Sequence, residues 1–175
     1  MELKTASMMF GRFNPPTAAH LHVFKKCTQI GDPWVFMSHT HDNTKNPLTF
    51  DEKIKICKKS IPNVNFGSRD VKNIIEACKY LNQLKYKNLV YVAGSDRSDE
   101  FENLLKRYNG TEYNFENINV VCAGKRSGTT KIENTSGSLL RKYVIDNDQK
   151  SFEKYFINPE LSNETFSLLR KRLKS

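Results

Sequence analysis

The chain of 175 residues lacks any hydrophobic run that approaches the roughly 20 residues needed to span a bilayer. Its first residues, MELKTASMMFGRF, also lack the apolar segment and small-residue cleavage site of a secretory signal peptide. We therefore expect a cytoplasmic protein with no membrane partner.

Cysteine is scarce, and its spacing argues against a disulfide framework. The chain has four cysteines, and no two of them form a C-x-x-C pair. Three of the four fall on the apolar faces of expected helices or strands, where a thiol behaves as a small hydrophobic group. We therefore expect reduced, buried thiols. The cysteines are Cys27, Cys57, Cys78 and Cys122.

Acidic residues are few relative to basic ones, 19 against 28, which gives a net charge of +9. A protein with this excess binds an anionic partner or tolerates its charge, and nucleic acid and small phosphates both qualify as partners. The excess is spread along the chain, and no arginine-rich arm is present. Charge alone therefore does not choose between the two partners. One local cluster near the end comprises Arg170, Lys171, Arg172 and Lys174.

Strand and helix patterns alternate along the chain. Hydrophobic residues make up 38% and aromatic residues 11%, which is enough for a packed core. The expected strands cover 8–13, 34–38, 64–66, 88–93 and 118–123. Helical spacing of apolar residues predicts helices over 17–30, 50–60, 71–84, 101–108 and 136–145. The tail from 152 to 173 is expected to form one or two further helices.

This alternation, with apolar strands, predicts an α/β fold: a Rossmann-like, doubly wound parallel sheet covered on both faces. Thr49 and Glu52 form a capping-box pattern at the start of the second helix. Asp70 is expected to cap the third. Residues 1–148 are expected to form one domain, and residues 149–175 a short helical extension packed on it.

Four polar segments follow four of the expected strands, at residues 11–20, 38–45, 94–97 and 124–141. Ligands of open α/β sheets bind at the carboxyl ends of the strands, near the point where the strand order reverses. The coincidence of four polar segments with four strand ends predicts a single ligand site.

In the first segment, Gly11 would let a phosphate approach the backbone, and Thr17 can cap the following helix, whose N-terminus favours anions. His20 lies one turn into that helix on the same side as Thr17, where its imidazole could donate to a phosphate oxygen. The alternative is a proline-rich turn before an ordinary amphipathic helix, with His20 exposed.

In the last segment, two hydroxyls open a helix and an arginine follows one turn later. Ser136, Ser138 and Arg141 could clamp a polyphosphate tail together with the helix amides. The alternative is a common serine cap with a surface arginine.

The two remaining segments are less specific. Gly94, Asp96 and Arg97 suit ribose or phosphate recognition, or form a plain strand-to-helix turn. The loop after the second strand is expected to bind substrate, because no second cluster of ligands supports a metal site at His39, His41 and Asp42. Its candidate residues are Ser38, His39, Thr40, Lys45 and Asn46.

Two of these segments resemble family signatures. GRFNPPTAAH resembles the G-x-F-x-P-x-H-x-G-H signature of the HIGH-motif nucleotidylyltransferase superfamily, and TSGSLLR resembles its second signature, I-S-x-T-x-I-R. The order GRF-x-P, SHT, NPLTFDEKI and SG-S-x-x-R is similar to that of the archaeal-type nicotinamide mononucleotide adenylyltransferases. The forms GRFNPPT and VAGSDR are most similar to phage-encoded members, some of which are head-completion nucleotidyltransferases. The resemblance covers about residues 6–145.

The resemblance implies transfer of AMP from ATP to a phosphate acceptor, most simply nicotinamide mononucleotide to give NAD, with release of pyrophosphate. It implies Mg²⁺ bridging the substrate phosphates. The implied catalytic residues are His20, Thr17, Lys45 and Arg141, with Lys45 near the acceptor phosphate. The implied nucleotide-binding residues are Gly11, Arg12, Phe13, Asn14, His20, Gly94, Asp96, Arg97, Ser136, Ser138 and Arg141.

Three departures from the family pattern leave alternatives open. Thr17 stands where the family usually has its first histidine, and Ala19 replaces a glycine. No counterpart of the tryptophan-bearing segment that stacks the nicotinamide ring is present in the sequence. The alternatives are a cytidylyltransferase with another acceptor, a virion protein that binds phage capsid or neck proteins, and a plain nucleic-acid binder.

Overall fold

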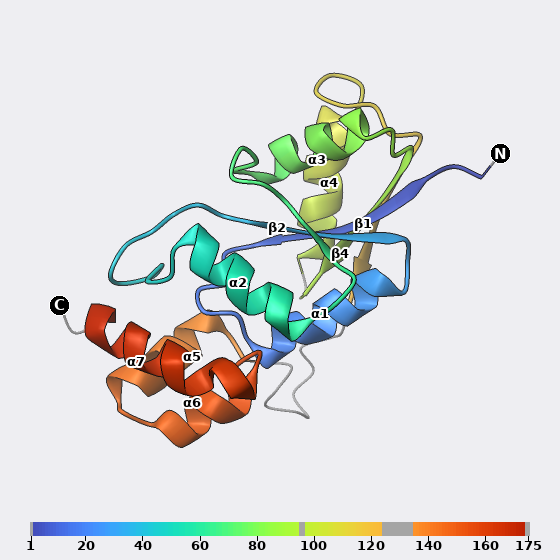
Figure 1. Ribbon diagram of the computed structural model, residues 1–175. Helices are drawn as coiled ribbons and strands as arrows, with labels where there is room; N and C mark the ends of the chain where they lie inside the picture. The colour runs from blue at the N-terminus through green and yellow to red at the C-terminus, as the bar shows by residue number, and fades with distance from the viewer. Residues whose placement is uncertain (1, 95–96, 124–134, 174–175) are drawn as a thin grey trace. The chain divides into compact units, whose positions relative to one another are not determined.

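The computed structural model describes residues 2–94, 97–123 and 135–173 (Figure 1). They form two compact units, which are described separately. The first unit comprises Met1–Gly11, Val23–Met37 and Asn63–Arg126, and the second comprises Arg12–His22, Ser38–Pro62 and Ser127–Ser175.

The first unit contains, within its described residues, a sheet of five parallel strands in the order β3-β2-β1-β4-β5. The chain runs from β1 outward through β2 to β3 and then returns to the other side of β1 for β4 and β5. The strand order therefore reverses between β1 and β4. The strands are β1 (Thr5–Gly11), β2 (Asp32–Met37), β3 (Asn65–Phe66), β4 (Asn88–Ala93) and β5 (Asn117–Cys122).

Helices cover both faces of this sheet. Successive side chains of each strand point to opposite faces, so each face has side chains that pack against helices. Met8 of β1 shares a core with Leu81 of α3 (Ile74–Gln83) and Leu105 of α4 (Ser98–Tyr108). On the other face, the Ser7 hydroxyl donates to the carbonyl of Cys27 in α1 (Ala18–Thr28) at 2.7 Å. The predicted Rossmann-like α/β fold is confirmed.

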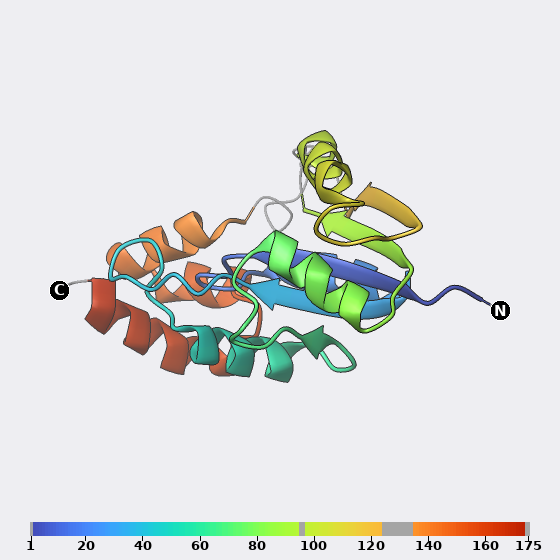
Figure 2. The ribbon, with the colours of Figure 1, turned by 90° about the horizontal axis from the view of Figure 1, so that it is seen from above.

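Aromatic packing fixes α3 over β2. Figure 2 shows α3, in green, lying across one face of the sheet. The Tyr80 ring of α3 packs edge-on against Trp34 and Phe36, with ring centroids 5.6 and 6.2 Å apart. The Trp34 indole also donates to the Tyr86 hydroxyl at 3.1 Å. The half-buried Trp34 of β2 is therefore held by both apolar and polar contacts.

In the described part of the second unit, helices are joined by irregular segments such as residues 38–46. The tail of this unit packs through buried aromatic rings: the Phe152 ring stacks on Phe156 with centroids 5.0 Å apart and meets Phe166 edge-on at 5.3 Å. The predicted boundary at residue 148 falls between α5 and α6 and remains a prediction. The helices are α2 (Phe50–Ser60), α5 (Gly137–Ile145), α6 (Gln149–Tyr155), the 3₁₀ turn η1 (Pro159–Leu161) and α7 (Ser162–Leu173).

Several predicted boundaries differ from the structure, including the start of α4, which is Ser98 rather than residue 101. Two of the differences have clear local reasons. The first strand ends at Gly11 rather than residue 13, because Phe13 has a φ of 48°, which a strand does not allow. The third helix begins at Ile74 and is capped by Asn73, whose side chain accepts from the Glu76 amide at 2.9 Å. Asp70 therefore does not cap it.

The cysteines follow the expectation in three of four cases. Cys27, Cys57 and Cys78 are buried, and Cys122 is exposed. Burial raises the pKa of the Cys27 and Cys78 thiols to about 12. None of the helices in the described part of the chain is both long and apolar enough to cross a membrane.

Gly67 tests the packing of β2. A Cβ atom at Gly67 would lie 2.2 Å from Cδ1 of the fully buried Phe36 ring. We expect Gly67→Ala to lower the free energy of unfolding by about 1–3 kcal/mol, because the ring must leave its position. Urea denaturation measures this loss.

The matched control is Gly94→Ala, whose Cβ would meet only Val23 Cγ2, at an ordinary 3.6 Å. We expect a change within about 0.5 kcal/mol for the control. Equal stability of the two variants would show that Phe36 does not pack as described.

Candidate active site

The start of α1 is built from a reciprocal pair of hydrogen bonds between Thr17 and His20. The His20 amide donates to the Thr17 hydroxyl at 3.3 Å, and the Thr17 amide donates to Nδ1 of His20 at 2.9 Å. Since Thr17 precedes the first helical residue and His20 is the third, this is a capping box with histidine in the place of glutamate or glutamine. His20 therefore has a structural role that the sequence did not show.

The same pair of bonds fixes the proton on the imidazole. Because Nδ1 of His20 accepts a hydrogen bond, the neutral ring carries its hydrogen on Nε2. The buried Phe13 ring packs edge-on against the imidazole, with ring centroids 4.7 Å apart. The Thr17 hydroxyl is fully buried and donates to the Thr135 carbonyl at 3.2 Å. Thr17 and Phe13 thus orient His20, and Nε2 is its donor.

Asn14 is used inside the protein rather than presented at its surface. It is 3% exposed, and its amide binds Leu48 twice, donating to the carbonyl at 3.0 Å and accepting from the N–H at 2.7 Å. Its predicted contact with a nucleotide would therefore have to come from its backbone. Arg12, two residues earlier, is exposed.

The start of α5 lies against the same segment. Ser136 caps the helix by accepting from the Leu139 amide at 3.2 Å. Arg141 donates to the Asn14 carbonyl at 2.7 Å through Nη1 and to the Ser138 hydroxyl at 3.0 Å through Nη2. The structure therefore brings the two signature segments, 12–20 and 135–141, together within the second unit.

The electrostatics of Arg141 favour an anion. Burial lowers the pKa of its guanidinium first, and the positive charge of Arg12 lowers it further, while Asp42 acts in the opposite sense. The exposed Ser138 hydroxyl and the amides at the start of α5 can also donate hydrogen bonds to an anion. Two cations beside a helix N-terminus form a setting in which a polyphosphate would be stabilised.

The 38–46 loop is held in shape by Asp42. Its carboxylate accepts from the amides of Thr44, Lys45 and Asn46 at 2.9, 2.7 and 3.2 Å, and from the Asn46 side chain at 2.7 Å. These hydrogen bonds, that of the Asn46 side chain foremost, hold the pKa of Asp42 well below its usual range. Lys45 is exposed at the surface of this preformed loop.

Other side chains of the loop have different surroundings. The His39 ring stacks on Phe50 at 4.2 Å, and Thr40 is exposed. Ser38 Oγ and Asn46 Oδ1 are buried and have no hydrogen-bond partner within the described part of the chain. The described residues contain no group of three or more His, Cys, Asp or Glu side chains placed to hold a metal ion.

Lys53 is a functional candidate that the sequence reasoning missed. Its side chain is buried, and Nζ donates to the carbonyls of Arg12 at 2.8 Å and Ser38 at 2.6 Å. It thereby joins the segment that carries His20 to the start of the 38–46 loop. The spacing was a signal: Lys53 lies four residues before Cys57, so the two residues share one face of α2, and both are buried.

Gly11, Gly94 and Arg97 are the predicted nucleotide-binding residues in the described part of the first unit. Gly11 ends β1 and Gly94 follows β4. The Arg97 guanidinium pairs with Glu100 through bonds of 2.9 and 2.8 Å. Asp96 lies outside the described residues. A part for these residues in ligand binding stays a prediction.

Lys53 gives a testable pH dependence. Burial lowers the pKa of its ammonium from 10.5 to about 8. Below pH 8 the folded protein bears the full cost of the buried charge, and this cost is relieved as the pH rises towards 10.5, because only the unfolded chain then binds the proton. We expect wild type to gain stability relative to Lys53→Met between pH 8 and 10.

The measurement is the free energy of unfolding of both proteins at each pH. The buried thiols change the free energy of unfolding with pH in both proteins alike. The difference in this free energy between wild type and Lys53→Met therefore reports the lysine. A difference that stays constant across this range would mean that Lys53 is not desolvated.

With this geometry described, comparison with known proteins gives the family. The sequence pattern of the family described as Cytidylyltransferase-like matches residues 8–151. Among curated protein sequences, none matches the chain at a significant level. One similar solved structure is a protein of Vibrio parahaemolyticus provisionally named a nicotinate-nucleotide adenylyltransferase. It has a TM-score of 0.62 and 15% identity over 92% of this chain and 97% of that one. Since the family pattern covers most of the sequence, including both signature segments, the chain belongs to the cytidylyltransferase-like family of nucleotidyltransferases.

Proposed function

We propose that the protein is an adenylyltransferase that transfers AMP from ATP to nicotinamide mononucleotide, giving NAD and pyrophosphate. The observation that carries the proposal is the bond from Arg141 to the Asn14 carbonyl, which joins the start of α5 to the segment bearing His20. The 38–46 loop, which Asp42 holds in shape through hydrogen bonds, offers a place for the acceptor beside the triphosphate.

In the proposed reaction an acceptor phosphate oxygen attacks the α-phosphorus of ATP in line. A new P–O bond forms, the bond from the α-phosphorus to the oxygen bridging it to the β-phosphate breaks, and its electron pair leaves on pyrophosphate. Arg141, Ser138 and the α5 amides would hold the β- and γ-phosphates. Nε2–H of His20 would donate to the α-phosphate as negative charge grows there. No covalent intermediate with the protein is needed, because the chain positions the reactants.

Magnesium would neutralise part of the triphosphate charge. The Asp42 carboxylate is occupied by hydrogen bonds from its own loop, so it suits a structural role better than metal ligation. An ion held by substrate oxygens and water fits this donor set, since Mg²⁺ commonly keeps several waters beside phosphate ligands.

Cytidylyl transfer is a second candidate, favoured by the description of the matching family. A third is a virion protein that keeps the fold without turnover, and it is favoured by the burial of Thr17 where the family usually has a histidine. Fold alone does not choose among the three.

The first experiment measures pyrophosphate release with ATP or CTP, with Mg²⁺ or with chelator. The acceptor panel is nicotinamide mononucleotide, nicotinate mononucleotide, phosphopantetheine and glycerol phosphate. We expect turnover with ATP, Mg²⁺ and nicotinamide mononucleotide. Turnover with CTP or another acceptor alone would replace the proposed substrates. Absence of turnover throughout, with copurification of capsid proteins, would favour the virion role.

Substitutions at His20 separate its two roles. His20→Ala removes both the cap and the donor, and we expect kcat to fall by about 10²–10³-fold, with ATP binding reduced far less. His20→Gln can accept from the Thr17 amide and still carries an N–H donor, so it should recover part of the rate. His20→Glu keeps the cap but has no donor and brings a negative charge towards the phosphates.

The measurements are kcat, ATP affinity and melting temperature for the three variants. We expect His20→Glu to keep the melting temperature of wild type while remaining as inactive as the alanine variant. If activity instead followed melting temperature across the series, His20 would be a helix cap alone.

A further inference from the structure

We propose that Arg172, near the end of α7, is a positioning residue that holds the C-terminal end of the 38–46 loop in the conformation that receives the acceptor. The inference rests on the proposed function, in which this loop binds the acceptor. Arg172 lies 27 residues after Ile145, the last residue of α5 (172 − 145 = 27), and outside both signature segments.

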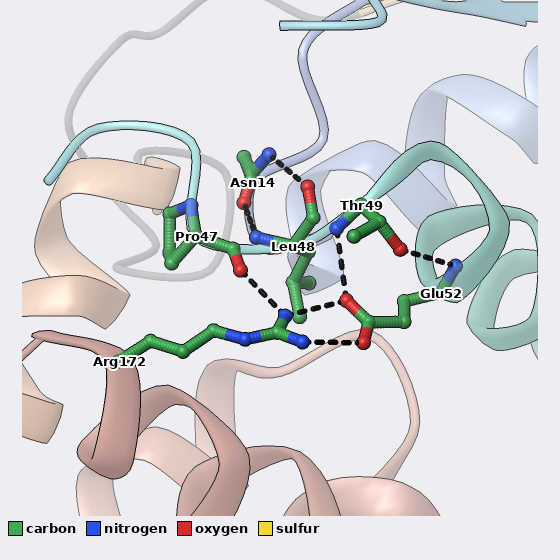
Figure 3. Close-up of polar contacts among 6 residues, drawn as sticks. All are labelled: Asn14, Pro47, Leu48, Thr49, Glu52 and Arg172. Carbon is green, nitrogen blue, oxygen red and sulfur yellow. Dashed lines mark hydrogen bonds and ion pairs between the residues drawn. The ribbon is translucent and has the colours of Figure 1, made fainter. Parts of the chain in front are cut away.

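The contacts of Arg172 form a three-point clamp (Figure 3). Nη1 donates to the Pro47 carbonyl at 2.7 Å and to Oε2 of Glu52 at 2.6 Å, and Nη2 donates to Oε1 at 2.8 Å. The two side chains are 25% and 30% exposed. The Arg172 hydrogen bond is the main cause that lowers the pKa of Glu52 to about 2. Such a planar, two-point ion pair is specific for arginine.

The clamp acts on a segment that is already part of the candidate active site. Glu52 also accepts from the Thr49 amide at 2.8 Å, completing the capping box of α2. Between Pro47 and Thr49, Leu48 is bound on both sides by the Asn14 amide, as Figure 3 shows. Arg172 therefore holds the backbone at Pro47, one residue before Leu48, which Asn14 binds.

The loop between the two clamped ends has no helix or strand of its own. Asn46, which closes the loop on Asp42, directly precedes Pro47, and Lys53 holds the other end at the Ser38 carbonyl. Fixing both ends before a ligand arrives reduces the conformational entropy that binding must overcome. Loss of the Arg172 clamp should thus weaken acceptor binding selectively.

Helix α7 is a firm base for this clamp. Phe166 and Leu169 on the same helix are buried at 3% and 0% exposure, so the helix is anchored independently of Arg172. Lys171 is exposed on α7 and provides a matched control for removal of a cation. The hydrogen bonds described for Arg172 go to Pro47 and Glu52, neither of which is a proposed reacting group, so its proposed role is positioning.

The test compares Arg172→Ala with Lys171→Ala and wild type. For Arg172→Ala we expect the acceptor KM to rise about ten- to thirtyfold, the loss typical of charge-assisted hydrogen bonds, with ATP KM within about twofold. Lys171→Ala should match wild type. An equal rise in both KM values together with a lower melting temperature would reduce Arg172 to a purely structural role and overturn the proposal. If the alanine variant does not fold, Arg172→Lys takes its place.

A second readout does not depend on turnover. The amides of Asn46 and Leu48 donate to Asp42 and Asn14, so their hydrogen exchange reports whether the loop end is ordered. We expect faster exchange at both in Arg172→Ala, with β4 amides unchanged. Unchanged exchange at Asn46 and Leu48 would overturn the positioning role. Absence of turnover in wild type would instead refute the proposed function, and exchange would still decide whether Arg172 orders the loop.

Discussion

Asn14 is the residue on which the arrangement of the second unit depends. Its side chain binds both backbone groups of Leu48, and its carbonyl accepts from Arg141. One residue thus links the segment bearing His20, the end of the 38–46 loop and the start of α5. A Cβ atom at Gly137 would lie 3.1 Å from the same carbonyl, a tight contact, so the close approach of α5 favours a glycine.

Local signals in the sequence predicted the elements well where they were unambiguous. The capping box at Thr49 placed α2 at Phe50–Ser60, and a short apolar run placed β4 at Asn88–Ala93. The start of α3 was wrong because Asp70 and Asn73 are both good caps, and only the fold selects Asn73. The end of β1 was wrong because a positive φ at Phe13 costs energy locally, and Lys53 and Arg141 hold the carbonyls of the two residues beside it from distant positions in the sequence.

The sequence indicated which segments form the candidate site better than it indicated what each side chain does there. Nucleotide binding by Phe13 and Asn14 and a catalytic part for Thr17 stay predictions. In the structure the three side chains are buried and support His20 or the 38–46 loop. Lys53 and Arg172 escaped prediction because their partners are 15 to 125 residues away, and spacing along one helix carries no such information. A signature motif therefore identifies a site, while tertiary contacts divide its residues into those that bind and those that orient.

The positive charge of the chain has a role that net charge alone could not show. Three cations donate to main-chain carbonyls. Lys53 binds those of Arg12 and Ser38. Arg141 binds that of Asn14, and Arg172 that of Pro47. Irregular backbone leaves such carbonyls without ladder partners, and a cation satisfies them more strongly than a neutral donor does. Arg141 also lies within reach of the charge of Arg12, which lowers the pKa of the Arg141 guanidinium. The same side chains can therefore order the loops and favour an anionic substrate, so an excess of basic residues does not require nucleic acid as its partner.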